Sequence, residues 1–185
     1  MKVISVNLGE KKQVIWRKRT IETGIFKTPV QNPIFLDIED VQHDNVIDRK
    51  YHGGIEKAVY AYGENHYDYW RELYPDLDWN YGMFGENLTI TNLDETKIYV
   101  GSIYQLGEAK IEVTKSRQPC FKLGIRFNNS KVIKQFWNST KSGIYFKILQ
   151  TGYVAKNDEL VLLESKIENF TIAEVYESKR VKQDK

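Results

Sequence analysis

The chain of 185 residues has one cysteine, four prolines and no long apolar run. A lone cysteine cannot form an intramolecular disulfide, which excludes the small secreted domains that depend on such bonds. No apolar stretch approaches the roughly 20 residues that a membrane-spanning helix needs, so we expect no membrane insertion. The first residues, Met1–Asn7, lack the apolar core of a signal peptide. These absences predict a cytoplasmic protein.

The chain also has no strong excess of charge of one sign, because 27 Lys and Arg residues nearly balance 25 Asp and Glu residues. The formal net charge is +2. Binding to a phosphate backbone needs a concentrated basic face, so a nucleic-acid polymer is not an expected partner. Hydrophobic residues make up 41% of the chain and charged residues 28%, which is typical of a globular protein. The length fits one domain with a single core.

Short runs of β-branched and aromatic residues recur about every ten residues, separated by Gly, Asn and Asp. This spacing indicates a mainly β protein, either a barrel or a sandwich, with a few short helices. The expected strands are Lys2–Leu8, Gln13–Arg17, Ile34–Ile38, Lys57–Tyr62, Asn87–Ile90, Ile103–Leu106, Lys110–Thr114, Ile144–Leu149 and Glu159–Leu163.

Two segments follow a helical period instead. In Glu64–Leu73, positions 66, 69, 70 and 73 carry the apolar stripe, and Pro75 ends the helix. In Ser130–Asn138, Ser130 is the expected N-cap and positions 132, 133, 136 and 137 form the stripe. Near the C-terminus, Thr171–Tyr176 can start a helix, whereas we expect the polar Glu177–Lys185 to fray.

Cys120 follows a strand-like stretch and lies three residues after Arg117. A neighbouring cation stabilises the thiolate, the form that attacks electrophiles and binds metals. The alternative is a small buried core residue, because cysteine is among the most buried side chains. Local sequence leaves both interpretations open.

A second cluster combines the Gly53-Gly54 pair with His52 and Lys57. Paired glycines let a backbone approach a ligand and present N–H groups, while His52 and Lys57 add a titratable donor and a cation. The cluster predicts an anion cradle, and a hairpin turn with a surface lysine is the alternative.

A third cluster, Tyr81–Ile90, is rich in glycine and leads into a strand. Asn87 offers an amide and Glu86 a carboxylate to a ligand. We favour the alternative, in which both side chains satisfy backbone groups in a tight corner. His66 lies on the apolar stripe of the first helix and is expected to be a packed residue. The three histidines and one cysteine lack the spacing of a structural zinc site.

Taken in order, these clusters resemble the MOSC domain family, the molybdenum-cofactor sulfurase C-terminal domain, and within it the small bacterial YiiM-type branch. The matching segments cover roughly residues 1–165, which leaves 166–185 as a short C-terminal helical or frayed tail. The resemblance rests on Thr23–Val30, His52-Gly53-Gly54, Lys57–Tyr60, His66-Tyr67, Trp70, Gly85–Leu88, Arg117–Cys120, Gly143–Tyr145 and Gly152–Asp158.

The chain departs from the branch in two places. His43-Asp44 stands where the branch usually has Gly-Asp, which affects the expected geometry of that turn. The branch also continues into a C-terminal helical region, of which this chain has only the first segment. If that region helps to deliver electrons, a separate electron-donor protein is an expected partner.

The resemblance implies a MOSC-type β-barrel, similar to the pyruvate-kinase β-barrel, that binds the molybdenum cofactor (molybdopterin). Cys120 is then the molybdenum ligand and a catalytic residue. His52 is a second catalytic residue, and either His52 or Asn87 orients the substrate or the ligand shell. The implied cofactor-binding residues are Gly53, Gly54, Lys57, Asn87, Arg117 and Gln118, with Arg49 and Lys50 at the rim.

The implied reaction is the reduction of N-hydroxylated small molecules such as hydroxylaminopurines, in which the cofactor performs the redox step. Two other functions stay open: a sulfur-delivery domain with a persulfide on Cys120, and a barrel that binds an anion without chemistry. The family resemblance also carries an association with pyridoxal phosphate binding, and it allows a homodimer.

Overall fold

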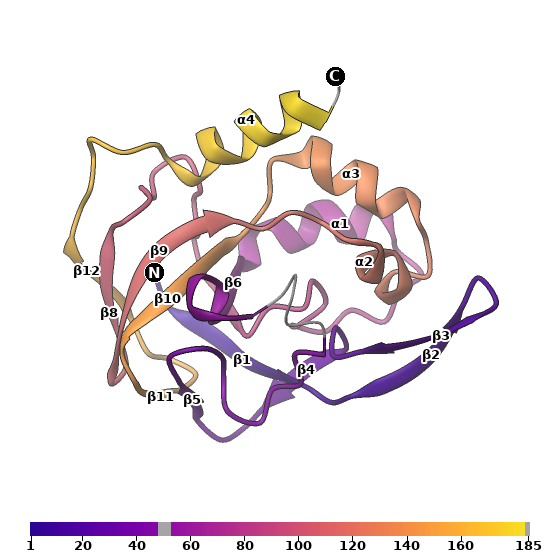
Figure 1. Ribbon diagram of the computed structural model, residues 1–185, viewed down its shortest axis with the longest axis horizontal. Coiled ribbons are helices and arrows are strands. Elements are labelled where there is room, and N and C mark those ends of the chain that lie inside the picture. Colours follow the sequence, from indigo (N-terminus) through magenta and orange to yellow (C-terminus); the bar gives the residue numbers. More distant parts are fainter. Residues whose placement is uncertain (48–52, 184–185) are drawn as a thin grey trace.

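A curled eight-stranded sheet forms the centre of the molecule, which the computed structural model describes over residues 1–47 and 53–183 (Figure 1). The strand order is β12-β8-β9-β10-β6-β7-β1-β4, and the β6–β7 pair is parallel whereas the other pairs are antiparallel. The strands are β1 (Val3–Gly9), β4 (Lys27–Val30), β6 (Val59–Gly63), β7 (Leu88–Ile90), β8 (Ile103–Leu106), β9 (Ala109–Ser116), β10 (Ile144–Gln150) and β12 (Leu160–Glu164).

Two smaller sheets and a set of short helices complete the fold. The pairs are β5 (Ile34–Leu36) with β11 (Gly152–Val154) and β2 (Lys12–Trp16) with β3 (Arg19–Thr23). The helices are η1 (Ile55–Lys57), η2 (Glu64–His66), α1 (Tyr67–Leu73), α2 (Phe121–Arg126), α3 (Lys131–Ser139) and α4 (Ile172–Gln183). Within the part of the chain described, no helix has the length and apolar character needed to cross a membrane.

The large sheet bends until its edge strand β12 meets the start of β1. Lys2 and Glu159 form an isolated antiparallel bridge, and the Val3 N–H donates to the Asp158 carbonyl over 2.9 Å. The Leu160 N–H likewise donates to the Met1 carbonyl over 3.0 Å. These bonds give the wall a barrel-like form around the core.

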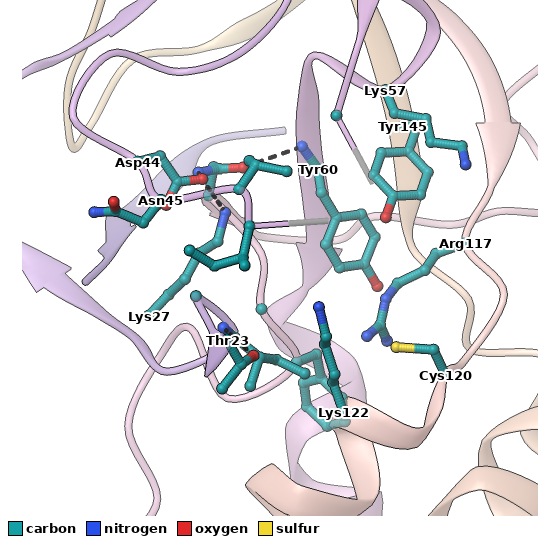
Figure 2. Close-up of a pocket in the computed structure, with 18 of the residues that line it drawn as sticks. Thr23, Lys27, Asp44, Asn45, Lys57, Tyr60, Arg117, Cys120, Lys122 and Tyr145 are labelled. Carbon is teal, nitrogen blue, oxygen red and sulfur yellow. Dashed lines mark hydrogen bonds and ion pairs between the residues drawn. The ribbon is translucent and has the colours of Figure 1, made fainter. Parts of the chain in front are cut away.

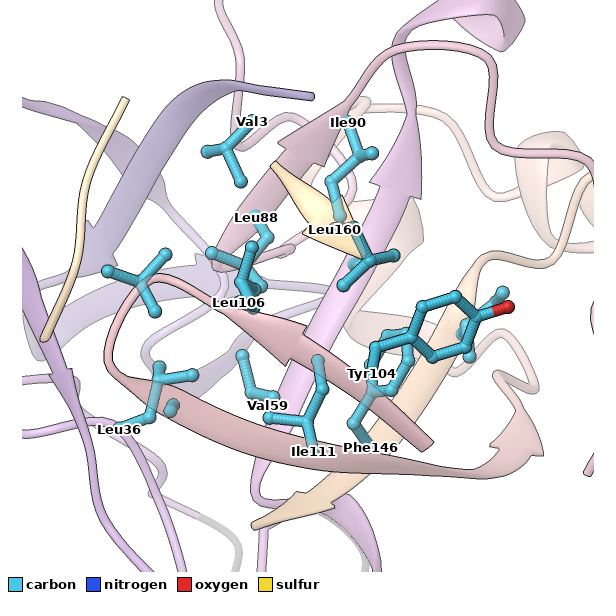
Figure 3. Packing of buried hydrophobic residues seen from close by; sticks show 14 of the residues in the cluster. Val3, Leu36, Val59, Leu88, Ile90, Tyr104, Leu106, Ile111, Phe146 and Leu160 are labelled. Carbon is cyan, nitrogen blue, oxygen red and sulfur yellow. The ribbon is translucent and has the colours of Figure 1, made fainter. Parts of the chain in front are cut away.

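The inside of this wall is lined by alternating apolar residues, as expected where successive side chains point to opposite faces of a strand. In β9, for example, Ile111 and Val113 are buried while Glu112 between them is partly exposed. Figure 3 shows side chains from β1, β5, β6, β7, β8, β9, β10 and β12 meeting in this core. The labelled members are Val3, Leu36, Val59, Leu88, Ile90, Tyr104, Leu106, Ile111, Phe146 and Leu160.

A second, aromatic cluster joins α1 and α3 to the outer face of β6. Tyr62 of β6 stacks on Phe84 with ring centroids 4.2 Å apart, and Trp70 stacks on Phe136 at 5.9 Å. The Trp70 indole N–H also donates to the Tyr62 hydroxyl over 2.8 Å. Such rings bury large areas and lock the two helices in place. The functional cavity described below lies next to this cluster.

The mainly β fold is confirmed, and each expected strand overlaps an observed one. The elements that were missed are short or lack sequence signals. β4 contains Pro29, and the turn before β3 lacks the Gly or Asn that marks a hairpin. Helix α2 has only six residues and contains Gly124, so no helical period is visible.

Two details of α1 and α3 differ from the expectations. Tyr67, not Tyr69 or Leu73, is buried in α1. The Ser130 hydroxyl makes no capping bond, because the Asn129 side-chain oxygen instead accepts from the Lys131 N–H over 3.0 Å.

The expected fraying from Glu177 onward is wrong, since α4 continues to Gln183. The Thr171 N–H donates to the Glu174 carboxylate over 2.7 Å, and the Glu174 N–H donates to the Thr171 hydroxyl over 3.2 Å. This reciprocal capping box starts the helix. Buried Tyr176, which donates to the Phe136 carbonyl over 2.9 Å, anchors the helix to α3. The division of the chain at residue 165 stays a prediction.

Candidate functional site

A cavity opens at the end of β9, beside α2 and the loops that precede β4 and β6. It encloses about 640 Å³ of space free of protein atoms, part of it open to solvent. Figure 2 shows side chains from distant parts of the sequence converging on it. The described lining residues are Thr23, Gly24, Ile25, Lys27, Asp44, Asn45, Val46, Ile47, Gly53, Lys57, Ala58, Tyr60, Phe84, Gly85, Asn87, Arg117, Cys120, Lys122 and Tyr145.

Cys120 and Arg117 reach the cavity because β9 ends at Ser116 and α2 begins at Phe121. The intervening loop turns both side chains into the cavity, where the Arg117 guanidinium lies beside the Cys120 sulfur (Figure 2). Arg117 is only 4% exposed, and its guanidinium lies 5.2 Å from the ring centroids of both Tyr60 and Phe136. The cavity therefore contains a deeply buried cation next to its only thiol.

The Arg117 guanidinium has unused hydrogen-bonding capacity. Its Nη1 is buried and has no hydrogen-bond partner. Burial disfavours the charged form of Arg117, but the pKa of Arg117 still lies above its usual value, so the guanidinium is charged. A buried charge with an unsatisfied donor is costly unless an anion meets it. This geometry favours a negatively charged ligand beside Cys120.

The neighbouring phenols do not supply that negative charge. Burial raises the pKa of Tyr60 well above its usual value and also raises the pKa of Tyr145, so both hydroxyls stay protonated at neutral pH. The Tyr60 hydroxyl donates to the Ser142 carbonyl over 2.8 Å.

The opposite wall holds a buried ion pair between Lys27 and Asp44. The Lys27 Nζ lies 2.5 Å from Asp44 Oδ2, and the two side chains are 9% and 2% exposed. Asp44 also accepts from the Gly9 N–H over 2.8 Å and from the Asn87 side-chain amide over 2.9 Å. His43, where the family branch usually has glycine, adopts a φ of 65°, so the turn keeps a left-handed conformation.

Two further lysines line the cavity. Lys122 lies in the first turn of α2 and is 8% exposed. Burial lowers the pKa of Lys57, and repulsion from Lys115 adds to that effect. Four of the described lining side chains are thus cationic, Lys27, Lys57, Arg117 and Lys122, against the single carboxylate of Asp44. The surplus of positive charge suits an anion such as a phosphate.

The structure brings together five of the site residues expected from sequence: Gly53, Lys57, Asn87, Arg117 and Cys120. The other three expected residues are not among the described lining residues. The Gly54 N–H donates to the Glu39 carbonyl over 3.0 Å. Gln118 is exposed on the loop, and His52, like Arg49 and Lys50, lies outside the described residues.

Other lining residues were not expected as site residues: Lys27, Asp44, Tyr60, Lys122 and Tyr145. Lys27, Tyr60 and Tyr145 lie in segments that carry the family resemblance, and Asp44 lies in one of the places where the chain departs from the branch. Lys122 lies two residues after Cys120, which is a local cue. For the other four, spacing does not reveal which loops meet at one end of a curled sheet.

The favoured interpretations of Glu86 and His66 agree with the structure. Glu86 is fully buried and accepts from the N–H groups of Gly82 and Phe84 over 2.9 and 3.0 Å, and from the Tyr67 hydroxyl. His66 is buried with a ring nitrogen 2.9 Å from the Glu95 carboxylate. Both are thus packed residues that hydrogen-bond within the protein.

The described residues contain no group of three or more His, Cys, Asp and Glu side chains that could hold a metal ion. Cys120 is the soft ligand that lines the cavity.

Comparison with known proteins adds independent information. The family model described as MOSC domain matches residues 48–161. The uncharacterized protein YflK of Bacillus subtilis (strain 168) is 35% identical over 161 residues, which covers 87% of this chain and 72% of YflK. A protein of Gibberella moniliformis named reductase is 34% identical over 158 residues, which covers 84% of this chain but only 28% of the reductase.

A solved structure is similar over the whole chain. The crystal structure of YiiM from Geobacillus stearothermophilus is 32% identical and superposes with a TM-score of 0.81. The match covers 100% of this chain and 86% of that one.

Proposed function

The chain belongs to the MOSC domain family, in its YiiM-type branch, and we propose that it is a reductase of N-hydroxylated small molecules that uses a molybdenum cofactor. The observation that carries this proposal is the buried Arg117 guanidinium beside Cys120, with Nη1 unsatisfied. A site built in this way has its strongest affinity for a ligand that brings both an anion and a metal able to bind a thiolate.

The donor set fits the molybdenum cofactor. Thiolate sulfur is a soft ligand that suits a metal already bound by sulfur. The phosphate of the pterin needs cationic and N–H donors, which Arg117, Lys57 and Lys122 supply from two sides of the cavity. The protonated Tyr60 and Tyr145 add no competing negative charge.

In the proposed reaction, the N–O bond of an N-hydroxylated amine breaks, and two electrons and two protons convert it to the amine and water. The bound cofactor supplies the redox chemistry. The residues of this chain would bind the cofactor and orient the substrate. Cys120 would hold the metal, and Arg117 would neutralise negative charge beside it. The side-chain amide of Asn87 donates to the Asp44 carboxylate over 2.9 Å and lines the cavity.

The test is elemental analysis for molybdenum, with pterin fluorescence after oxidation, on protein from a host that makes the cofactor. We expect close to one molybdenum per wild-type chain and its loss in Cys120→Ser. Ser130→Ala is the matched control, because Ser130 is exposed and its hydroxyl makes no capping bond. Metal content in Cys120→Ser equal to that of wild type would contradict the ligand role.

A turnover assay follows, with reduced methyl viologen as electron donor and a hydroxylaminopurine as substrate. We expect amine formation by the loaded wild type and none by Cys120→Ser. Loaded protein that reduces no N-hydroxylated compound would contradict the proposed reaction.

A sulfur-delivery function is the second candidate, because the Arg117 cation beside Cys120 would stabilise a persulfide anion as well as a thiolate. Sulfur on Cys120 that cyanide releases, in protein without molybdenum, would favour this function. Full ligand binding and biological effect in Cys120→Ser would instead favour an anion-binding protein without chemistry.

Pyridoxal phosphate is a competing ligand, and a separate experiment can test for it. Burial lowers the pKa of Lys57, so more of its amine is neutral and able to form an imine with an aldehyde. Borohydride reduction followed by mass spectrometry would identify such an adduct on Lys57. We expect no adduct in protein loaded with the molybdenum cofactor.

A further inference from the structure

A β-hairpin extends from the molecule next to the cavity. It consists of β2, β3 and the turn between them, residues 12–23, and we name it the arm. In Figure 1 the arm extends beyond the curled sheet, and its strands pair only with each other. An isolated two-stranded hairpin is at best marginally stable in water. The arm therefore adds little to the stability of the core.

The arm concentrates positive charge. It contains four cations, Lys12, Arg17, Lys18 and Arg19, and one acid, Glu22, for a net charge of +3. The whole chain has a net charge of +2, so the residues outside the arm carry −1 in total. The arm thus carries a local positive excess on a protruding element.

Apolar side chains lie among these charges. Ile15 is 82% exposed, and the guanidinium of Arg17 lies 5.9 Å from the ring centroid of half-buried Trp16. Exposed Trp and Arg side chains are enriched where proteins bind each other and often carry most of the binding energy. The end of the arm combines both types.

The geometry of the turn does not explain why Arg17 and Lys18 occupy it. Arg17 and Lys18 have φ values of 49° and 64°, in the left-handed region. A two-residue turn with this geometry is best formed by Asn-Gly, and other residues pay a conformational penalty there. Hairpin formation would therefore favour neutral Asn-Gly over Arg-Lys at these positions.

The base of the arm connects to the cysteine. β3 ends at Thr23, which lines the cavity. Phe26 lies between the Lys12 ammonium, 5.5 Å from its ring centroid, and the Arg126 guanidinium, at 5.1 Å. Arg126 ends α2, whose six residues extend about 9 Å along the helix axis from Cys120. A protein bound to the arm would lie beside the cavity.

We propose that the arm is the docking surface for an acidic electron-transfer protein that carries a flavin or an iron–sulfur cluster. This inference rests on the proposed function, because reduction of each hydroxylamine to amine and water consumes two electrons and two protons. The donor protein is oxidised as it supplies the electrons, and the protons come from water. Complementary charge steers such encounters and speeds association by about tenfold or more.

The test compares two electron donors on cofactor-loaded protein. An acidic flavodoxin, reduced beforehand, has to dock, whereas reduced methyl viologen is a small molecule that does not. The variant carries Arg17→Asn, Lys18→Gly and Arg19→Thr, which removes three charges while giving the turn its preferred residues. The matched control removes three exposed charges elsewhere, with Lys131→Gln, Lys134→Gln and Lys156→Gln.

We expect the arm variant to lower the ratio of flavodoxin-driven to viologen-driven rate by about tenfold at low ionic strength. The control variant should keep the wild-type ratio, and added salt should reduce the difference between wild type and arm variant because it screens charge. An unchanged ratio in the arm variant would overturn the proposal, as would an equal loss in the control.

Binding of oxidised flavodoxin, measured by titration calorimetry, separates this inference from the proposed function. If viologen drives no reduction, the proposed function fails, and binding that depends on the arm still supports docking. No binding of flavodoxin by the wild type at low salt would overturn the docking surface. Binding of a DNA or RNA oligonucleotide in preference to flavodoxin would also overturn it.

Discussion

The buried ion pair between Lys27 and Asp44 should make the two residues strongly coupled in stability. Asp44→Asn keeps the shape of the side chain and an acceptor for the Gly9 N–H. It also leaves the Lys27 ammonium, 9% exposed, without its counter-charge. Removing one partner of a buried pair costs about 3–5 kcal/mol, so we expect Asp44→Asn to lose about 4 kcal/mol of unfolding free energy.

The reciprocal change should be less damaging. In Lys27→Met, Asp44 keeps two donors, the Gly9 N–H at 2.8 Å and the Asn87 amide at 2.9 Å. We expect a loss of about 2 kcal/mol, the range for hydrogen bonds to charged groups. The double variant contains no buried charge at this position and should lose about 3 kcal/mol, which gives a coupling energy of about 3 kcal/mol.

Urea unfolding of the four proteins, followed by tryptophan fluorescence, measures these differences, because Trp70 is fully buried. The same samples can be titrated with inorganic phosphate. Asp44→Asn should bind phosphate more tightly than wild type, since the cavity loses its one described carboxylate. Additive losses, with a coupling energy below about 0.5 kcal/mol, would refute this account of the pair.

Three further predictions follow from buried or strained groups. Arg117→Met removes the unsatisfied Nη1 and should therefore stabilise the cofactor-free protein by about 1–3 kcal/mol in urea unfolding. The same variant should lose molybdenum retention. A variant less stable than wild type would contradict the cost assigned to Nη1. Burial raises the pKa of Glu86, so the stability that this group contributes is complete below its ordinary pKa of 4.5 and is lost as pH rises through the folded pKa. The stability advantage of wild type over Glu86→Gln should therefore shrink with rising pH, and a constant difference in urea unfolding would exclude this linkage. Because the pKa of Lys57 is lowered, limited reductive methylation at about pH 8 should label Lys57 faster than exposed Lys131, and equal labelling by mass spectrometry would count against a lowered pKa.

Most of the fold could be predicted from local patterns. Strand periodicity reflects a side-chain alternation that operates within a few residues, so each expected strand was found in place. The predictions failed where a tertiary contact, which leaves no local apolar pattern in the sequence, determines the structure. Helix α4 continues past Glu177 because Tyr176 is buried against α3, and the charged residues around it gave no sign of that contact.

The candidate site was predictable only in part. Cys120 and Arg117 are close in sequence, and the composition of the loops around Gly53 and Asn87 left ligand binding open as one of two interpretations. The family resemblance, now supported by the comparisons, connected these separate segments. It did not indicate that Gln118 is exposed or that Gly54 is not among the described lining residues.

The sequence alone determined the family, the mainly β architecture and the position of the single thiol, because these depend on local motifs and on the order in which they occur. Tertiary structure decided which charges surround that thiol. Lys27, Asp44 and Tyr145 come from loops and strands far apart in the chain, and they meet only because the sheet curls. The unsatisfied Arg117 guanidinium is likewise a property of packing, since burial and hydrogen-bond partners exist only in the folded chain.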